Sequence, residues 1–155
     1  MSVQLFVPKE YGYVILTTIG TCFLGFWHAG RVANFRRKAK VPYPKAFADS
    51  GDLSSASSGE QKKAMYIFNC AQRAHANYLE NHGMTMAAML IAGVQHPLWA
   101  TGLGLVWAAN RIAYAIGYTR ADKTDGSGRY AGIAFSLPQV GLCGLAAWVG
   151  LKMVM

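Results

Sequence analysis

Charged residues are scarce in this chain of 155 residues. Only 14% of its residues are Asp, Glu, Lys or Arg and 53% are hydrophobic, whereas a soluble domain carries about 25% charged residues. This composition excludes an intrinsically disordered chain, which needs low hydrophobicity and high charge, and it disfavours a water-facing globule. Acidic residues are fewer than basic ones, 7 against 15, so the net charge is +8. Such an excess suits nucleic acid, anionic lipid or a small anionic ligand.

Cysteine is also scarce. Cys22, Cys70 and Cys143 lie far apart in the sequence and do not have the spacing of metal ligands. We interpret them as small apolar residues within helices, and we expect no metal site.

Charge is absent altogether from three long runs, residues 11–30, 81–110 and 130–151. A helix needs about 20 mostly apolar residues to cross a bilayer, and Pro97 divides the middle run because the residue before a proline avoids the helical conformation. The sequence therefore predicts an all-α integral membrane protein whose residues 1–155 form one four-helix bundle domain. The predicted helices cover about residues 10–38, 65–94, 98–118 and 130–153.

The charges that are present lie mainly in two predicted loops, residues 39–64 and 119–129, while the turn at His96-Pro97 has no Lys or Arg. The positive-inside rule places both basic loops in the cytosol and both termini on the other side. The basic charge then lies beside membrane lipids, so we expect no nucleic-acid partner. The Ser-, Gly- and Asp-rich segment 49–59 predicts a flexible surface loop.

Ionisable residues inside membrane spans are costly and usually face a bundle interior or a cavity. Two predicted helices carry polar side chains at spacings that place each set on one helix face: Arg73, Asn77 and Glu80, and Arg111, Tyr114 and Tyr118. His75 lies about 200° around the helix from Arg73 and points toward another contact.

These polar faces have two interpretations. They can build a pocket for a ligand with carboxylates and one ammonium group, because Arg binds carboxylates as a rigid fork, Glu pairs with ammonium and Tyr donates a hydroxyl. Alternatively, Arg73 and Glu80 form a structural ion pair, Tyr114 and Tyr118 belong to an interfacial aromatic belt, and the basic cluster that begins at Arg36 anchors the membrane surface.

Several motifs resemble one known family. FNCAQRAHANYLE (68–80), followed by GVQHP and GLGLVWAANRIAYAIGY (102–118), resembles the MAPEG family of membrane-associated proteins in eicosanoid and glutathione metabolism. KVPYP (40–44) is similar to its type-three microsomal glutathione S-transferase subgroup. The resemblance covers nearly the whole chain. It implies a four-helix membrane protein that assembles as a homotrimer and binds glutathione between adjacent subunits.

The resemblance also implies a set of glutathione-binding residues: Arg36, Arg73, His75, Asn77, Glu80, Arg111, Tyr114 and Tyr118. In that scheme Arg36 and Arg73 hold carboxylates, Glu80 holds the glutamyl ammonium, and the two tyrosines lie near the peptide and the sulfur. Two positions differ from leukotriene C synthase of the same family, which has a glutamine where this chain has His75 and a tyrosine where it has Asn81.

Simple counting along the sequence does not place an arginine at the position of the family's catalytic arginine. Seven residues after Tyr118 the count reaches Asp125, but the loop here is longer, which shifts the register. Arg129, which opens the last predicted helix, is our candidate for the catalytic residue that stabilises the thiolate. Lys123 and Arg120 are the alternatives.

The expected chemistry starts from a free thiol, whose pKa of about 8.5 a neighbouring arginine can lower. The resemblance implies that glutathione, as a co-substrate, attacks a lipophilic electrophile or reduces a lipid hydroperoxide, which makes the protein a transferase with peroxidase activity. A non-catalytic lipid-presenting scaffold is the alternative, because the family also contains the lipoxygenase-activating protein. We expect the endoplasmic reticulum membrane as the location, with the mitochondrial outer membrane as the alternative.

Overall fold

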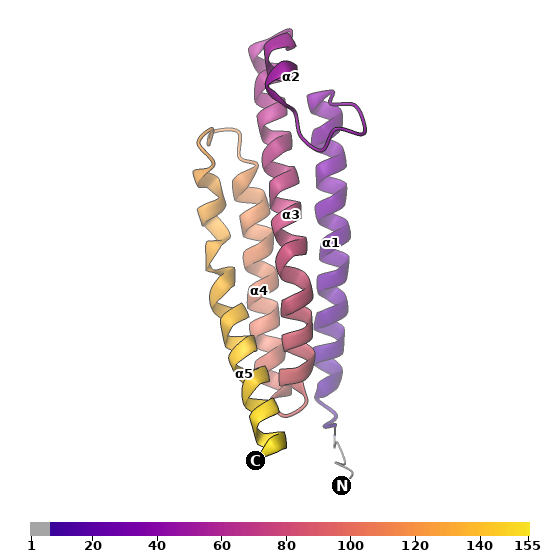
Figure 1. The fold of residues 1–155 in the computed structure, drawn as a ribbon, viewed down its shortest axis with the longest axis vertical. Helices are drawn as coiled ribbons and strands as arrows, with labels where there is room; N and C mark the ends of the chain where they lie inside the picture. Colours follow the sequence, from indigo (N-terminus) through magenta and orange to yellow (C-terminus); the bar gives the residue numbers. More distant parts are fainter. Residues whose placement is uncertain (1–6) are drawn as a thin grey trace.

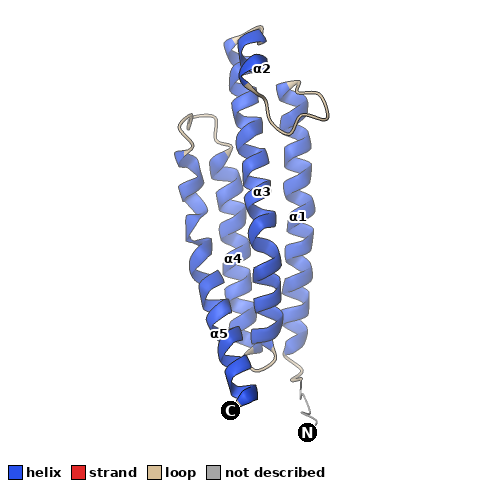
Figure 2. Ribbon diagram, viewed as in Figure 1, coloured by secondary structure: helices blue, strands red, loops and turns tan. Residues whose placement is uncertain are grey.

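The computed structural model describes residues 7–155, and all regular structure in this range is helical (Figures 1 and 2). The prediction of an all-α protein is therefore confirmed for these residues. The elements in chain order are α1 (Tyr11–Ala39), α2 (Ser50–Ser55), α3 (Gly59–Gly93), α4 (Pro97–Tyr118), the 3-10 helix η1 (Ser127–Phe135) and α5 (Ser136–Val154).

The long helices run side by side along the long axis of the molecule (Figure 1). The α3 helix packs against α1, α4 and α5, and η1 packs along α4 before it continues into α5. The connections 40–58 and 119–126 lie at one end of the bundle, whereas the start of α1, the turn between α3 and α4, and the end of α5 lie at the other. The two basic connections therefore share one end.

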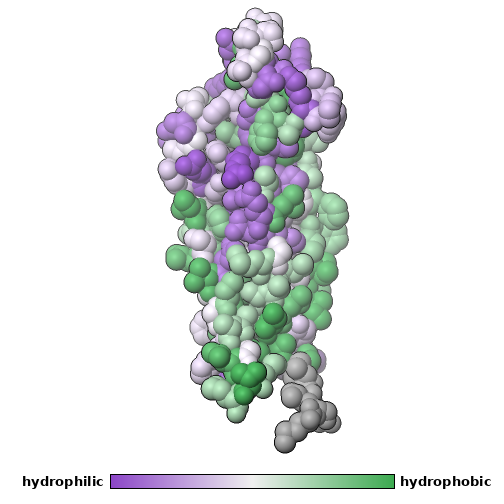
Figure 3. All heavy atoms as spheres, in the orientation of Figure 1, coloured by the Kyte–Doolittle hydropathy of each residue, from purple (hydrophilic) through white to green (hydrophobic). Residues whose placement is uncertain are grey.

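Among residues 7–155, two helical segments are long and apolar enough to cross a membrane, Tyr11–Ala39 and Ser127–Val154. Large apolar side chains are exposed on the outside of the bundle, among them Leu16, Phe26 and Val140 at 70%, 73% and 70%. In Figure 3 hydrophilic residues gather at the end with the basic connections, and hydrophobic residues cover the opposite half of the visible face. Exposed apolar surface of this extent fits a protein surrounded by lipid.

The third helix begins earlier than the pattern of apolar residues indicates, at Gly59 instead of near Met65. Ser58 is the reason, because its hydroxyl accepts a hydrogen bond from the backbone N–H of Gln61 at 3.1 Å and caps the helix. The polar first turns of α3 therefore extend the helix beyond its apolar part.

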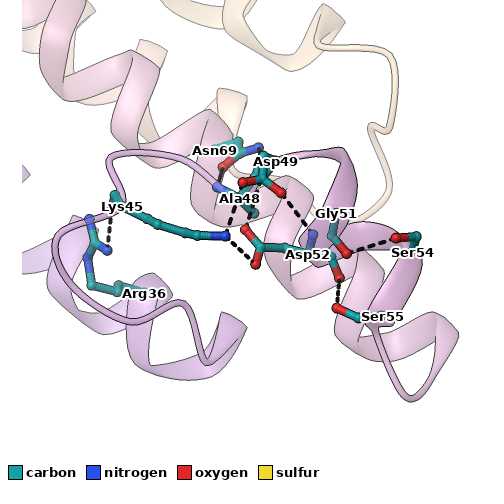
Figure 4. Close-up of polar contacts among 9 residues, drawn as sticks. All are labelled: Arg36, Lys45, Ala48, Asp49, Gly51, Asp52, Ser54, Ser55 and Asn69. Carbon is teal, nitrogen blue, oxygen red and sulfur yellow. Dashed lines mark hydrogen bonds and ion pairs between the residues drawn. The ribbon is translucent and has the colours of Figure 1, made fainter.

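The segment expected to be a flexible loop, residues 49–59, contains the short helix α2. Asp49 caps α2, and its carboxylate and that of Asp52 each accept a hydrogen bond from the other's backbone N–H, at 2.9 and 3.0 Å. Lys45 pairs with both carboxylates at 3.0 and 2.7 Å (Figure 4). The Asp52 N–H and the Lys45 ammonium hold the pKa of the Asp49 carboxyl below its usual range, so α2 stays capped at neutral pH.

The same connection is tied to two long helices. The Asn69 side chain of α3 accepts a hydrogen bond from the Ala48 N–H at 2.8 Å and donates one to the Ala48 carbonyl at 2.9 Å. Arg36, at the end of α1, donates to the Lys45 carbonyl at 2.7 Å (Figure 4). The connection is therefore held against the end of the bundle.

Glycines allow η1 to lie directly on α4. A Cβ atom added to Gly132 would overlap with the backbone of Asn110 and Tyr114, and one added to Gly128 would overlap with the Gly117 carbonyl. Small residues of this kind permit close approach of helix backbones in membrane bundles. This contact fixes the position of Arg129, which η1 carries.

Candidate functional site

A series of polar contacts connects the middle of α3 with α4. The Arg73 Nη1 atom lies 3.1 Å from Glu80 Oε1. The second Glu80 oxygen accepts a hydrogen bond from Asn77 Nδ2 at 3.3 Å, and Arg111 donates to Asn77 Oδ1 at 2.9 Å. The three α3 residues thus share one face, as their spacing predicts, and they interact with one another.

The residues at the two ends of this series of polar contacts differ in exposure. The side chains of Arg73 and Glu80 are 54% and 51% exposed, so a ligand can reach both. Arg111 is fully buried, and its guanidinium carbon lies 4.2 Å from the centre of the Phe135 ring and 4.9 Å from that of Tyr114. Arg111 therefore contacts the exposed pair through Asn77, whose amide it orients.

A cavity of about 490 Å³ adjoins Arg73. Its walls include Tyr118 from α4, Arg129 from η1, Asp125 from the preceding loop and Phe47 from the connection 40–58. The structure thus brings together Arg73, Tyr118 and Arg129, three residues that the sequence separates by up to 56 positions. Three cationic or hydroxyl donors facing one cavity can bind an anion.

Arg129 is held by aromatic rings. Its guanidinium carbon lies 6.0 Å from the Tyr118 ring centre and 5.2 Å from that of Tyr130, whose hydroxyl accepts a hydrogen bond from Nη2 at 3.4 Å. Arg120, by contrast, forms a two-pronged ion pair with Asp122 at 3.0 and 2.7 Å and does not line the cavity. Lys123 is likewise not among its lining residues.

Asp125 places a negative charge in the wall of this cavity. Hydrogen bonds from Ser127 hold the pKa of the Asp125 carboxyl below its usual range, and the Ser127 backbone N–H lies 3.0 Å from Oδ1. The carboxylate is therefore ionised at neutral pH and opposes the binding of an anion nearby.

Two residues of the expected set lie apart from the others within the single chain. Arg36 is buried, donates to the Lys45 carbonyl and lies 4.3 Å from the Tyr43 ring centre, so it supports the connection. His75 stacks on His28 of α1 with ring centres 6.1 Å apart. The angle of about 200° between His75 and Arg73 explains this, because it turns the imidazole toward α1.

The model of the MAPEG family matches residues 14–148 of this chain. The chain belongs to the MAPEG family. Members of this family bind glutathione and lipophilic substrates in membranes, and they include transferases and peroxidases as well as non-catalytic proteins. The cluster around Arg73 and Glu80 lies within the matched region of this MAPEG protein.

Some residues of this MAPEG bundle escaped the sequence interpretation. Arg31 of α1 donates hydrogen bonds to the Ala115 carbonyl and the Thr119 hydroxyl at the end of α4. Asn81 and Gln139 form an amide pair between α3 and α5 at 3.2 Å. For Asn81 and Gln139 the available signal was a polar residue in a charge-free run, because a bilayer offers such a residue no water. Arg31 follows directly after the first run and had no such signal.

Proposed function

We propose that this MAPEG protein is a membrane glutathione transferase with glutathione-dependent peroxidase activity, related to the type-three microsomal subgroup. One observation carries the proposal. A half-exposed arginine and glutamate, Arg73 and Glu80, form an ion pair, and Arg73 lines a cavity that Arg129 also lines. A groove that binds only lipid would not need a carboxylate that accepts an ammonium group.

The exposed pair suits the two charged ends of a γ-glutamyl peptide. Glu80 pairs with the glutamyl ammonium, and Arg73 forms a charge-assisted hydrogen bond with a carboxylate. Arg111 is a positioning residue, because it is buried and holds the Asn77 amide in place beside Glu80. Tyr114 packs against Tyr118 with ring centres 5.6 Å apart and supports the hydroxyl that lines the cavity.

Arg129 is the proposed catalytic residue. Its permanent positive charge stabilises the thiolate without accepting the proton. In conjugation the sulfur bonds to an electrophilic carbon; with an epoxide, the C–O bond breaks and the oxygen takes up a proton. With a hydroperoxide the O–O bond breaks, two glutathione thiols are oxidised to the disulfide, and the lipid is reduced to an alcohol with release of water.

The assembly we propose is a homotrimer of four-span subunits in the endoplasmic reticulum membrane, with both basic connections in the cytosol. Arg36 and His75 lie away from Arg73 in the protomer, and in a trimer they would serve the site of the adjacent subunit. The shared end of the two basic connections supports this orientation.

The test is the ultraviolet thiolate band of glutathione on addition of detergent-solubilised protein at neutral pH. We expect a band with the wild type and a much weaker one after Arg73→Ala, which should mainly weaken glutathione binding. Arg37→Ala is the matched control, because Arg37 is exposed at the end of α1 and the same charge is lost. Absence of a band with retained lipid binding would favour the lipid-presenting scaffold.

A further inference from the structure

The loop between α4 and η1 turns at Gly126, in the wall of the cavity that Arg73 and Arg129 line. Gly126 has a φ of 76°, a left-handed conformation that glycine adopts without strain. A Cβ atom added there would lie 3.5 Å from Arg129 Nη1, 3.6 Å from the Tyr118 ring and 3.9 Å from the Tyr66 hydroxyl oxygen. These three side chains come from η1, α4 and α3, and they converge on one small space beside Gly126.

Tyr66 is the member of this group that the expected glutathione site does not include. It lies in α3 seven positions before Arg73, a spacing that places both residues on the same helix face, and it lines the same cavity. Asn77 and Glu80 continue this face further along the helix. The half-buried Tyr66 therefore extends the polar face toward the start of α3, where Arg129 approaches it.

A phenol complements an arginine where the ligand is a thiolate. Tyrosine donates its O–H as a neutral group, whereas arginine remains charged. Arg129 Nη2 bonds the Tyr130 hydroxyl, and Nη1 is the Arg129 atom nearest the space beside Gly126. A sulfur atom that enters this space from the cavity can receive one N–H from a cation and one O–H from a neutral donor. Hydrogen bonds to the charged form of a group favour that form.

We propose that Tyr66 is a further catalytic residue, whose hydroxyl donates a hydrogen bond to the glutathione sulfur as the thiolate forms. Arg129 supplies the positive charge, Tyr66 keeps its proton, and the proton of the thiol leaves to water. The inference rests on the proposed function and places the sulfur of that site beside Gly126.

Other groups around the cavity act on the same thiol. The two arginines favour the thiolate and the carboxylate opposes it. The titratable and charged side chains that line the cavity besides Tyr66 are Cys70 and Arg73 of α3, Tyr118 of α4, Asp125 of the loop and Arg129 of η1. Replacing Tyr66 with phenylalanine leaves all of them in place and removes a neutral group, so a shift of the thiol pKa reports the lost hydroxyl.

The experiment measures the pKa of glutathione bound to the detergent-solubilised full chain, from the pH dependence of its ultraviolet thiolate band. We expect Tyr66→Phe to raise this pKa by about one unit, because a hydrogen bond to a charged group is lost. The thiolate fraction below both pKa values then falls about tenfold, and turnover falls with it. Glutathione affinity at the acidic end of the titration, where the bound thiol is protonated, should change less than about twofold.

Two further variants accompany Tyr66→Phe. Tyr66→His keeps an N–H donor on a ring and should hold the thiol pKa within about half a unit of the wild-type value. Tyr13→Phe is the matched control, because it loses a hydroxyl at the opposite end of the bundle, where Tyr13 is 58% exposed. The Tm of each variant, recorded on the same samples, separates loss of the hydroxyl from loss of the fold.

An unchanged thiol pKa in Tyr66→Phe would overturn the inference. A loss of affinity at acidic pH as large as the loss of turnover would do the same, since a merely structural tyrosine predicts it. Should Tyr66→Phe not fold, Tyr66→His decides, and a rise of a full unit in that variant overturns the inference. A wild type without a thiolate band refutes the proposed function and this inference with it, whereas a wild-type band that Tyr66→Phe leaves unchanged refutes the inference alone.

Discussion

Replacing Arg129 with alanine should lower turnover much more than glutathione affinity. Arg129 lines the same cavity as Arg73, and a cation beside a thiol lowers the thiol pKa because it stabilises the thiolate. A neighbouring arginine can bring a thiol pKa from about 8.5 to about 7 or below. Without the cation only about 3% of the thiol is ionised at pH 7, since its pKa returns to about 8.5. The turnover number should then fall up to about 30-fold at pH 7.

The assay is the pH dependence of kcat and KM for conjugation, with the thiolate band recorded on the same samples. In Arg129→Ala the deficit should shrink as the pH rises past about 8.5, because the unassisted thiol then ionises by itself. Arg129→Lys, which keeps the charge, should recover part of the activity. Arg120→Ala should have little effect, because Asp122 already neutralises Arg120. A deficit that is the same at every pH, or equal losses in kcat and affinity, would refute the thiolate role.

Three other changes test the surroundings of the site. Asp125→Asn removes the ionised carboxylate from the cavity wall and should lower the Kd for glutathione by roughly fivefold; calorimetry showing weaker binding would contradict this. Gly132→Ala should destabilise the contact of η1 with α4 by about 1–3 kcal/mol, seen as a lower Tm, whereas Gly144→Ala, which meets open space, should not. Asn69→Ala removes two hydrogen bonds of roughly 1 kcal/mol each and should speed proteolysis within residues 40–58; unchanged cleavage would mean that the connection is held elsewhere.

The sequence was sufficient to predict an all-helical protein. A long charge-free segment in a bilayer has few structures other than a helix that satisfy its backbone hydrogen bonds. The sequence did not predict the start of α3, because its first turns are polar and depend on the Ser58 cap. The short helix α2 depends similarly on the Asp49 and Asp52 capping box. Its capping residues, a carboxylate followed three positions later by another, were visible in the sequence but lay in a segment whose composition favours loops.

The candidate site was partly predictable. Helical spacing was sufficient to place Arg73, Asn77 and Glu80 on one face, because they lie on one helix. The same reasoning could not show that Arg111 is fully buried, since burial depends on how η1 packs over α4. Nor could it place Arg36 on the Lys45 carbonyl, because that contact requires the path of an irregular connection, which no periodic pattern describes.

The ion pair between Arg73 and Glu80 has a consequence for how the site fills. In the structure each of these charges neutralises the other at 3.1 Å. A zwitterionic peptide that binds both residues would therefore replace one internal ion pair with two intermolecular ones. No net charge is gained or lost at Arg73 and Glu80 in this exchange, so we expect their contribution to the affinity to depend only weakly on ionic strength. Opening the internal pair is then a step of its own, which can limit the rate at which the peptide enters.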